Sequence, residues 1–306
     1  MRDDFESALR EHAPGFHGAV RQNVPLKPFT HLRIGGPADW LVEPYDASDV
    51  QSIVRVCREL DQRLLVLGGG SNVLVSDEGV DAVVMRLDRM HQLVREDSRI
   101  TAGAGATLPG LLRSTRELGL AGLEVLTGVP AEVGGAVAMN AGTHEGSTFD
   151  HLVKLEVVDS SGELKLLEKE DFNPTYRNGG LGDQIVVSAT FDLKNDSPQA
   201  IYARFEQSLK RRNATQPVTE RSVGCVFKNP DGDSAGRLIE RAGCKTKSRG
   251  AVSVSGKHAN YFVHDGAGNS EDFLALAQDV RERVQKEFGV ELEFEVKRWG
   301  RGDAWA

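Results

Sequence analysis

The sequence predicts an α+β protein of two or three domains, and three observations favour this class. Its 306 residues are enough for more than one hydrophobic core. Short apolar runs, typical of strands, alternate with longer segments whose apolar residues recur at helical spacing. Two glycine-rich stretches, at residues 68–72 and 122–142, interrupt this pattern and offer bare backbone that a ligand could approach.

The first ninety residues predict a small strand–helix–strand unit. Residues 3–11 have a short helical pattern, and Pro25 and Pro28 mark an extended entry. Residues 47–60 predict an amphipathic helix, with an apolar stripe formed by Val50, Ile53, Val54, Cys57 and Leu60. Strands are expected at residues 40–42, 64–67 and 82–86.

Residues 100–199 predict one helix followed mainly by strands. The segment ITAGAGATLPG is similar to a dinucleotide fingerprint, but Leu108 stands where the third glycine is required, so we exclude a Rossmann fold. The helix that follows is expected to end near Leu118, with Gly119 as its C-terminal cap. Strands are expected at residues 152–159, 164–167 and 185–192.

A polar break at residues 195–199 precedes the C-terminal third of the chain. Helices are predicted at residues 200–214, 234–242 and 270–288. The last of these has a continuous apolar face, and Gly289 follows it. Strands are predicted at residues 252–254, 261–263 and 291–296.

Residues 122–142, here called the glycine stretch, are the segment around which the chain is organised. They read GLEVLTGVPAEVGGAVAMNAG. Gly134 and Gly135 allow close backbone approach because neither residue has a Cβ. Thr127 and Asn140 are uncharged polar residues that could hydrogen-bond a ligand. The alternative is a tight crossing of two backbone segments that serves packing alone.

A second cluster, here called the glycine loop, consists of Gly68, Gly69, Gly70, Ser71 and Asn72 and follows an apolar strand. Successive backbone N–H groups in such a loop can form a concave anion site, which suits a pyrophosphate. Ser71 and Asn72 would add side-chain donors. No Gly-Lys-Ser/Thr follows, so the loop is not of the Walker type. A plain turn is an equally good interpretation of this cluster alone.

Composition and charge exclude several classes of function. The net charge is −8 and no lysine or arginine run is present, so we expect no nucleic-acid partner. The N-terminus lacks the features of a signal peptide and no apolar run approaches membrane-spanning length, so we expect no membrane insertion. Three cysteines without CxxC spacing favour a cytoplasmic protein. The eight histidines show no metal-binding spacing, and we expect no metal. We also expect a monomeric chain, although nothing in the sequence determines the oligomeric state.

Several motifs, in order along nearly the whole chain, resemble those of the UDP-N-acetylenolpyruvoylglucosamine reductases. They are THLRIGG (residues 30–36), LGGGSNVLV (67–75), the glycine stretch, Tyr176-Arg177, SVGCVFKNP (222–230), KHANYF (257–262) and LEFEVKRWG (292–300). The short segment between Arg177 and Arg212 resembles the variant without an extra tyrosine-bearing loop. The resemblance implies non-covalent FAD and NADPH as hydride donor. It also implies reduction of UDP-N-acetylglucosamine enolpyruvate to UDP-N-acetylmuramate, a peptidoglycan precursor.

The resemblance further implies a two-subdomain FAD-binding fold of the vanillyl-alcohol-oxidase/PCMH type plus a C-terminal α+β substrate domain. The implied FAD subdomains are residues 1–90 and 91–199, and the substrate domain is 200–290. The strand at 291–306 would return to the first subdomain. The implied cofactor-binding residues are Gly68, Gly69, Gly70, Ser71, Asn72, Thr127, Gly128, Val129, Gly134, Gly135 and Ala138.

Arg177, Cys225 and Glu295 are the implied catalytic residues. Arg177 carries a planar fork that matches a carboxylate in two hydrogen bonds. Cys225 stands where the family has the serine that protonates the intermediate, and a thiol with a reference pKa of about 8.5 can also give a proton. Glu295 must be protonated, act through water or orient another donor, and the sequence leaves these open. The implied substrate-binding residues are Tyr176, Lys228 and Asn229.

Two residues depart from the family pattern. Cys225 replaces the usual serine, and packing after Gly224 is the alternative interpretation of this thiol. Gly179 replaces the serine of the YRxS pattern, which leaves the local loop geometry open. Two other functions therefore remain: a UDP-sugar-binding or flavin-binding protein without turnover, and an FAD oxidase of the related fold.

Overall fold

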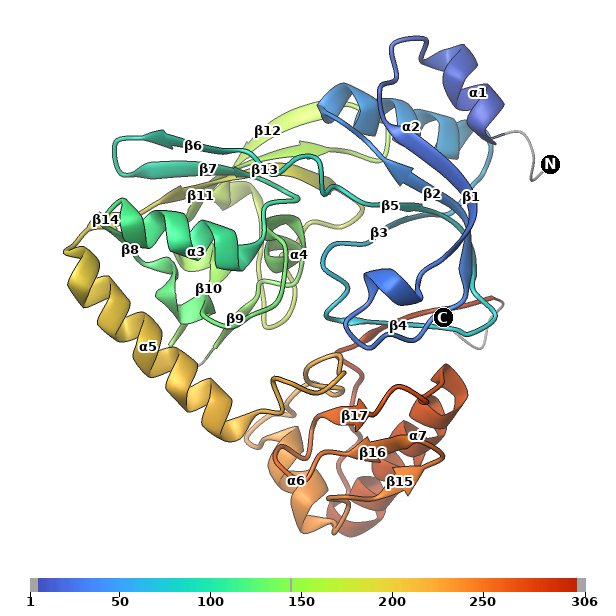
Figure 1. Cartoon of the computed structure of the whole chain (residues 1–306), viewed down its shortest axis with the longest axis vertical. Helices are drawn as coiled ribbons and strands as arrows, with labels where there is room; N and C mark the ends of the chain where they lie inside the picture. Colours follow the sequence, from blue (N-terminus) through green and yellow to red (C-terminus); the bar gives the residue numbers. More distant parts are fainter. Residues whose placement is uncertain (1–4, 144, 302–306) are drawn as a thin grey trace. The chain divides into compact units, whose positions relative to one another are not determined.

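The computed structural model describes residues 5–143 and 145–301, which form two compact units, each with its own hydrophobic core (Figure 1). Unit 1 takes its described residues from the ranges 1–22, 39–69 and 82–210. Unit 2 takes its described residues from the ranges 23–38, 70–81 and 211–306. Each unit is therefore assembled from three separate segments of the chain.

A four-stranded sheet of order β1-β2-β5-β3 lies mainly in unit 1. The α2 helix begins where the Asp46 side chain accepts hydrogen bonds from the N–H groups of Ser48 and Asp49. Phe5 of α1 packs against Trp40 of β2, with ring centroids 5.7 Å apart. The elements are α1 (Phe5–His12), β1 (Ala19–Pro25), β2 (Pro37–Glu43), α2 (Ala47–Glu59), β3 (Leu64–Val66) and β5 (Val80–Met85).

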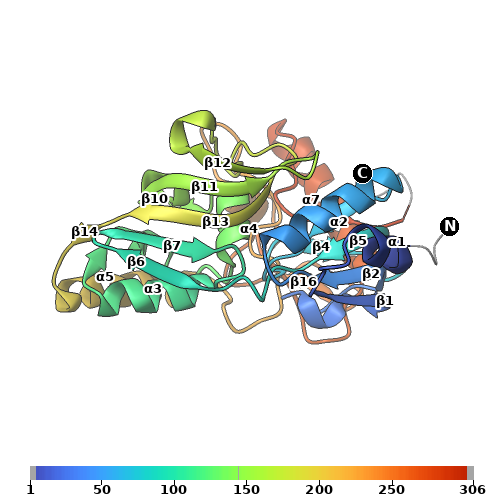
Figure 2. The ribbon, with the colours of Figure 1, turned by 90° about the horizontal axis from the view of Figure 1, so that it is seen from above.

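A second, five-stranded sheet of order β12-β11-β13-β7-β6 forms the other half of unit 1, and all its neighbouring strands are antiparallel. Figure 2 shows this sheet from above, and α4 packs against β13 and β7. The strands are β6 (Leu93–Glu96), β7 (Arg99–Gly103), β11 (Leu152–Val158), β12 (Leu164–Glu168) and β13 (Ile185–Asp192).

The remaining elements of this part of the chain are helices and short strands around the glycine stretch. α3 starts at a Thr107 cap, where the Thr107 hydroxyl accepts from the Gly110 N–H. The elements are α3 (Leu108–Glu117), β8 (Leu120–Ala121), η2 (Leu123–Leu126), α4 (Val133–Ala138), β9 (Gly142–Thr143), β10 (Gly146–Ser147), η3 (Thr148–Asp150), η4 (Lys169–Asp171), β14 (Lys194–Asn195) and α5 (Pro198–Thr215).

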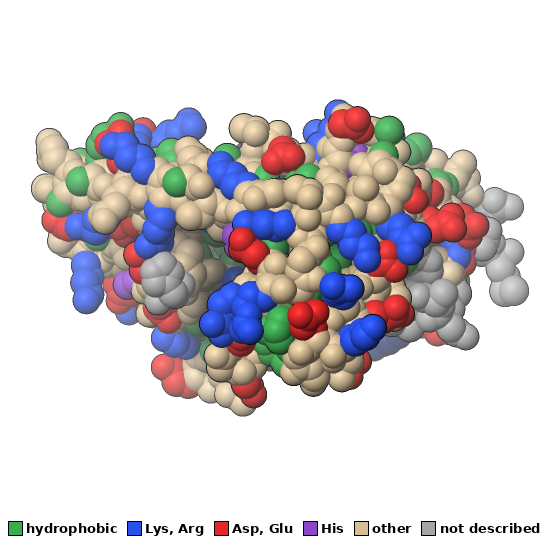
Figure 3. All heavy atoms as spheres, turned by 90° about the horizontal axis from the view of Figure 1, so that it is seen from below, with side chains coloured by type: hydrophobic (Ala, Val, Ile, Leu, Met, Phe, Trp, Pro, Cys, Tyr) green, Lys and Arg blue, Asp and Glu red, His purple; other side chains and the backbone are tan. Residues whose placement is uncertain are grey.

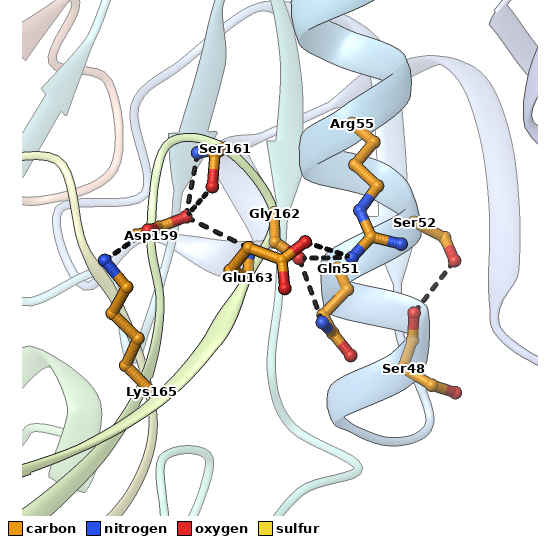
Figure 4. Close-up of polar contacts among 9 residues, drawn as sticks. All are labelled: Ser48, Gln51, Ser52, Arg55, Asp159, Ser161, Gly162, Glu163 and Lys165. Atoms are coloured by element: carbon orange, nitrogen blue, oxygen red, sulfur yellow. Dashed lines mark hydrogen bonds and ion pairs between the residues drawn. The ribbon is translucent and has the colours of Figure 1, made fainter.

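The turn between β11 and β12 fastens α2 to the five-stranded sheet (Figure 4). Asp159 accepts hydrogen bonds from the N–H groups of Ser161 and Glu163, and this turn places Gly162 at φ +83°. The Gly162 carbonyl then accepts from Gln51 and Arg55 of α2, each at 2.9 Å. A Cβ on Gly162 would lie only 2.5 Å from Arg55 Cγ, so glycine is required here for two reasons.

Unit 2 is built around the three-stranded sheet β15-β16-β17, against which α7 packs. Phe262 of β17 lies 6.1 Å from Phe227 and 5.3 Å from Phe273 of α7, measured between ring centroids. β18 pairs in parallel with β4, so the C-terminal strand lies beside the segment that follows the glycine loop. The elements are η1 (Lys27–Phe29), β4 (Val73–Val75), α6 (Ala235–Arg241), β15 (Ser248–Arg249), β16 (Val252–Val254), β17 (Phe262–His264), α7 (Ser270–Phe288) and β18 (Lys297–Trp299).

One predicted strand is wrong and several others are confirmed with small shifts. The expected strand at 291–296 is absent among the described residues, where only an isolated bridge joins Phe227 and Phe294. The strand ladder begins instead at Lys297, and residues 302–306 of the expected returning strand lie outside the described residues. Asp3, the expected start of the first helix, also lies outside them. The predicted helix at 270–288 is confirmed at both ends.

The surface and the helices of the described residues carry two further observations. On the face seen in Figure 3, acidic and basic side chains are interspersed, and hydrophobic side chains show only in small areas among them. Among the residues described, no helix combines the length and apolar character needed to cross a lipid bilayer. In the same residues, no group of histidine, cysteine and carboxylate side chains is arranged to hold a metal ion.

Candidate active site

The glycine stretch of unit 1 folds into two short helical pieces joined by a turn. Thr127 is buried after η2, and Gly128 follows at φ +77°. The Val129 N–H donates to the Leu126 carbonyl at 3.0 Å and closes this turn. Gly128 and Ala138, the latter at the end of α4, are both exposed. The stretch therefore presents small side chains and backbone to its surroundings.

The two adjacent glycines of α4 have different environments. A Cβ on Gly134 would lie 3.0 Å from the Ala104 Cβ, so this glycine permits a tight crossing with the segment after β7. A Cβ on Gly135 would meet no atom of the described residues within 4 Å. Packing therefore explains Gly134, whereas Gly135 leaves open space beside the helix.

The glycine loop continues this bare surface. In unit 1, a Cβ on Gly69 would lie 3.3 Å from the Pro130 carbonyl oxygen, and one on Gly68 would lie 3.4 Å from Glu132 Oε2. In unit 2, Gly70 has φ +66°, and a Cβ there would clash with the Phe29 carbonyl. Within unit 1, Gly68, Gly69 and the glycine stretch thus lack side chains of their own, as close backbone contact with a flat ring or a pyrophosphate requires. This arrangement fits FAD.

Glu132 is a buried carboxyl beside this loop. Its side chain is 7% exposed, and no hydrogen bond or ion pair to its carboxyl occurs within the described residues. Burial raises the pKa of the Glu132 carboxyl to about 7, the charge of Asp88 adds to the rise, and Arg86 opposes it. In the sequence, Glu132 is distinguished only as one of two charged residues in the glycine stretch.

Arg177 occupies a strained turn that lies beside Gly142, the last residue of the glycine stretch. The N–H and carbonyl groups of Thr175 and Asn178 are bonded to each other, and Arg177 between them has φ +58°. Its Nη1 donates to the Gly142 carbonyl at 3.2 Å, and its guanidinium lies 4.9 Å from the centroid of the Tyr176 ring. Both contacts fix the direction of the guanidinium, which is half-buried.

The structure explains why glycine stands at position 179. The Gly179 N–H donates to the Ala138 carbonyl at 2.9 Å, so the backbone lies directly against the end of α4. A Cβ on Gly179 would clash with the Val137 carbonyl oxygen. The Asn140 side-chain amide donates to the Thr175 carbonyl at 3.2 Å and ties the same turn to the glycine stretch. Arg177 is therefore positioned by residues on both of its sides.

In unit 2, residues 222–230, here called the cysteine segment, lie between two other backbone segments, which contain Tyr261 and Glu295. Asn260 is buried, and its side chain accepts from the Phe227 N–H at 3.0 Å and donates to the Phe227 carbonyl at 2.7 Å. Cys225 forms an isolated bridge with Tyr261. On the other side, the Glu295 N–H donates to the Val226 carbonyl at 2.8 Å. Cys225 and Glu295 are therefore on neighbouring segments.

Asn72 connects the glycine loop to Glu295 within unit 2. Its side-chain amide donates to the Glu295 carbonyl at 3.1 Å, and its own carbonyl accepts from the Lys297 N–H at 3.0 Å. Ser71 is half-buried, and a Cβ on Gly224 would lie 4.0 Å from its carbonyl oxygen. The unit 2 part of the glycine loop therefore lies beside the cysteine segment.

Lys228 and Asn229 lie at the end of the cysteine segment. The Lys228 ammonium is 3.1 Å from Glu293 Oε2, and its backbone N–H donates to the Glu293 carbonyl. The Asn229 side chain accepts from the Ala235 N–H at 3.0 Å and so fixes the start of α6. Both side chains have a structural contact within the unit.

The predicted catalytic residues divide between the units: Arg177 belongs to unit 1, and Cys225 and Glu295 belong to unit 2. Within unit 2 the structure brings Cys225, Glu295 and Asn72 together through backbone hydrogen bonds. Sequence reasoning missed the roles of Asn140 and Asn260. Both stand inside the quoted motifs: Asn140 was considered only as a hydrogen-bonder to a ligand, and Asn260, which precedes Tyr261, was not singled out.

Two domain families match this chain. Residues 38–167 match an FAD binding domain, and residues 216–299 match the C-terminal domain of UDP-N-acetylenolpyruvoylglucosamine reductase. The chain is 40% identical over 300 residues to the UDP-N-acetylenolpyruvoylglucosamine reductase of Moorella thermoacetica, covering 98% of this chain and 99% of the relative. It is also 40% identical over 303 residues to a protein of that description from Symbiobacterium thermophilum, covering 98% of this chain and 97% of the relative.

Solved structures agree with the sequence matches. The crystal structure of UDP-N-acetylenolpyruvylglucosamine reductase (MurB) from Thermus caldophilus is similar with a TM-score of 0.80 and 36% identity, covering 93% of this chain and 99% of that one. Phl p 4.0202, a glucose dehydrogenase, is similar in fold with a TM-score of 0.51 at 18% identity, over 64% of this chain and 44% of that one. The predicted α+β, FAD-binding fold class is confirmed. The chain belongs to the UDP-N-acetylenolpyruvoylglucosamine reductase family.

Proposed function

We propose that this protein reduces UDP-N-acetylglucosamine enolpyruvate to UDP-N-acetylmuramate for peptidoglycan synthesis, with FAD as cofactor and NADPH as reductant. The observation that carries the proposal is the 40% identity to a reductase of this description over 98% of the chain. The bare glycine surface and the fixed arginine supply a physical rationale for the same chemistry.

When bound, FAD would supply the hydride chemistry, with NADPH as the source of the hydride and the vinyl methylene carbon of the substrate as its acceptor. We assign the FAD pyrophosphate to Gly68, Gly69, Gly70, Ser71 and Asn72, because successive backbone N–H groups in such a loop can bind an anion. The residues assigned to the flavin side are Thr127, Gly128, Val129, Gly134, Gly135 and Ala138. The open space beside Gly135 supports this assignment, because packing within the protein does not require a glycine there.

Arg177 is assigned to the carboxylate of the enolpyruvyl group. Negative charge develops on the adjacent carbon and this carboxylate as the double bond is reduced, and a preorganised cation lowers the energy of that state. The contacts of Arg177 with the Gly142 carbonyl and the Tyr176 ring hold the guanidinium before substrate arrives. Tyr176, which is 51% exposed, is assigned to the substrate as well.

Cys225 is assigned as the proton donor to the carbon beside the carboxylate. The proton leaves Sγ as the new C–H bond forms, and solvent restores the thiol afterwards. Glu295 lies on the segment bonded to Val226 and serves the same step through its own proton, a bound water or another donor that it orients. Lys228 and Asn229 are assigned to the phosphates and nucleotide of the substrate, which requires Lys228 to exchange Glu293 for a phosphate oxygen.

The domain bounds at residues 90, 199 and 290 stay a prediction. A monomeric chain is also proposed, and light scattering on the purified protein tests it. The three free cysteines among the described residues support a reducing cytoplasm as the site of action.

One assay tests the proposed function. The purified protein should be yellow, and acid precipitation should release FAD into the supernatant. NADPH should bleach the flavin without oxygen, and the UDP-enolpyruvyl sugar should restore its colour and yield a product heavier by two hydrogens. A flavin that NADPH bleaches but the sugar leaves bleached would contradict the proposed reaction.

A further inference from the structure

Glu132 is a buried acid for which the mechanism above has no role. It lies at the N-terminal end of α4, and its backbone forms an isolated bridge with Thr107. The residue is 7% exposed, and no protein group among the described residues hydrogen-bonds its carboxyl. A buried polar group without a partner is costly, so such a group usually has a ligand or water to satisfy it.

The position of the Glu132 carboxyl relative to the glycine loop indicates which ligand could satisfy it. Oε2 lies on the side of Gly68 where a side chain would otherwise project, at 3.4 Å from the position of a Cβ. The neighbouring Gly69 has the Pro130 carbonyl and the Ala131 backbone against it, so the segment before α4 runs along the glycine loop. A ligand bound on the side of Gly68 where a Cβ would project would therefore lie beside the Glu132 carboxyl.

Burial is the main cause that favours the neutral form of Glu132; the charge of Asp88 acts in the same direction and that of Arg86 acts against it. Arg86 and Asp88 are the ionisable neighbours that act on it, and Arg86 is paired with Asp88. Asp88 Oδ1 is buried without a hydrogen-bond partner among the described residues. Neither residues 104–108 nor residues 67–69, which pack against this segment, contain an ionisable side chain. A pyrophosphate over the glycine loop would add further negative charge and repel an ionised Glu132.

We propose that Glu132 binds FAD as the neutral carboxylic acid and donates its proton to an oxygen of the dinucleotide beside Gly68, so that FAD affinity depends on protonation of this one side chain. The proposal rests on the assignment of the glycine loop to FAD under the proposed function. The neutral form of Glu132 predominates below pH 7 and is progressively lost above it, since burial raises the pKa of the Glu132 carboxyl to about 7.

The pH dependence of FAD release from the holoenzyme tests this proposal. The holoenzyme is diluted in steps at pH 6, 7.5 and 9, and free FAD is measured by its fluorescence. If only the acid form binds, the apparent Kd should rise about tenfold for each pH unit above 7, or roughly 100-fold by pH 9. Glu132→Gln keeps a donor that does not titrate, so its Kd should stay constant within about threefold over the same range.

Two further variants complete the comparison. Glu132→Ala removes the donor and should release FAD about 10-fold to 100-fold more readily at pH 6, the usual effect of losing a hydrogen bond to a charged group. Glu124→Gln is the matched control, because Glu124 is also buried in the glycine stretch but its carboxylate already accepts from Gly122 and Arg204. This control should retain the pH dependence of the parent.

The outcomes separate this proposal from the proposed function. A parent protein that binds no FAD at any pH would contradict both. A parent that binds FAD and reduces the substrate, but whose pH profile is flat or is unchanged in Glu132→Gln, would overturn the role of Glu132 alone. Tighter binding by Glu132→Gln than by the parent at pH 6 would also overturn it, because that result indicates an ionised Glu132 that repels the cofactor.

Discussion

The conformation of the glycine stretch in unit 1 depends on glycines, whose lack of a side chain lets backbone segments pack closely. The conformation of the cysteine segment in unit 2 depends instead on hydrogen bonds from one buried side chain. In unit 1, Gly134 and Gly179 allow backbone to lie against backbone. In unit 2, the Asn260 amide satisfies both the N–H and the carbonyl of Phe227. The difference teaches which substitutions each region tolerates: added atoms disturb the first, and lost hydrogen bonds disturb the second.

Substitutions of Cys225 should have the largest effect and concern chemistry in unit 2. Cys225→Ala removes the proposed proton donor, so turnover should fall by roughly 10²–10⁴-fold, the usual contribution of a general acid. Cys225→Ser retains an O–H group, should keep substantial activity, and should resist peroxide, since a thiol is oxidised to a sulfenic acid far more readily. Steady-state kcat before and after peroxide treatment measures both. Parent-like turnover by a folded, flavin-loaded Cys225→Ala would leave the thiol with a packing role.

Arg177 and Glu295 come next, one in each unit. Replacing either by alanine should lower kcat/KM for the enolpyruvyl sugar by about 10²–10³-fold, the usual cost of losing one electrostatic stabiliser. Steady-state kinetics at saturating NADPH measures this. Arg177→Lys is the matched control: it keeps the charge but not the planar fork, so it should recover only part of the activity. Full recovery would show that charge alone matters.

Asn260→Ala should be the most damaging of the structural substitutions. It leaves the buried N–H and carbonyl of Phe227 without their partner. Each unsatisfied group costs about 1–3 kcal/mol, so the free energy of unfolding should fall by roughly 2–5 kcal/mol. Urea unfolding of the variant and parent measures the loss. A loss below about 1 kcal/mol would mean that water readily replaces the asparagine.

Glycine substitutions in unit 1 should separate packing from cofactor binding. Gly179→Ala places a Cβ against the Val137 carbonyl and should destabilise the protein by about 1–3 kcal/mol through overpacking. Gly135→Ala meets open space and should leave the flavin-free protein as stable as the parent or up to about 1 kcal/mol more stable, since alanine favours the helix. The same variant should bind FAD more weakly. Thermal unfolding of flavin-free protein and FAD fluorescence measure the two effects.

The fold was predicted best where periodicity is strong. Helix α7 has a continuous apolar face, an Asn269 cap and a left-handed Gly289, so both its ends are marked in the sequence. Helix α4 was missed because two of its six residues are glycines, which disfavour helices, and its packing on β13 and β7 outweighs that preference. The strand predicted at 291–296 was misplaced because its alternating pattern is also satisfied by separate hydrogen bonds to Val226 and Lys228.

The candidate site was predicted through motifs rather than through geometry. The glycine clusters and the Tyr176-Arg177 pair could be recognised from the sequence, because they belong to motifs that resemble those of the family. Asn260 and Glu132 were not identified, since their roles depend on which backbone lies beside them. Gly179 looked like a departure from the family pattern, and only the Val137 carbonyl against it supplies the reason. Local sequence carries residue type, and tertiary structure decides what that residue contacts.

Rapid mixing without oxygen tests the central claim most directly, because it separates the two halves of the reaction. The flavin of the parent, Arg177→Ala and Cys225→Ala proteins is first bleached with NADPH and then mixed with the UDP-enolpyruvyl sugar, and flavin absorbance is followed in each step. If both residues act on the substrate, bleaching by NADPH should proceed within about threefold of the parent rate in both variants. Return of colour should slow by about 10²-fold or more in Arg177→Ala. In Cys225→Ala, the product, measured in samples quenched at intervals, should form more slowly by a comparable factor. Equal slowing of bleaching and recolouring would contradict the assigned roles.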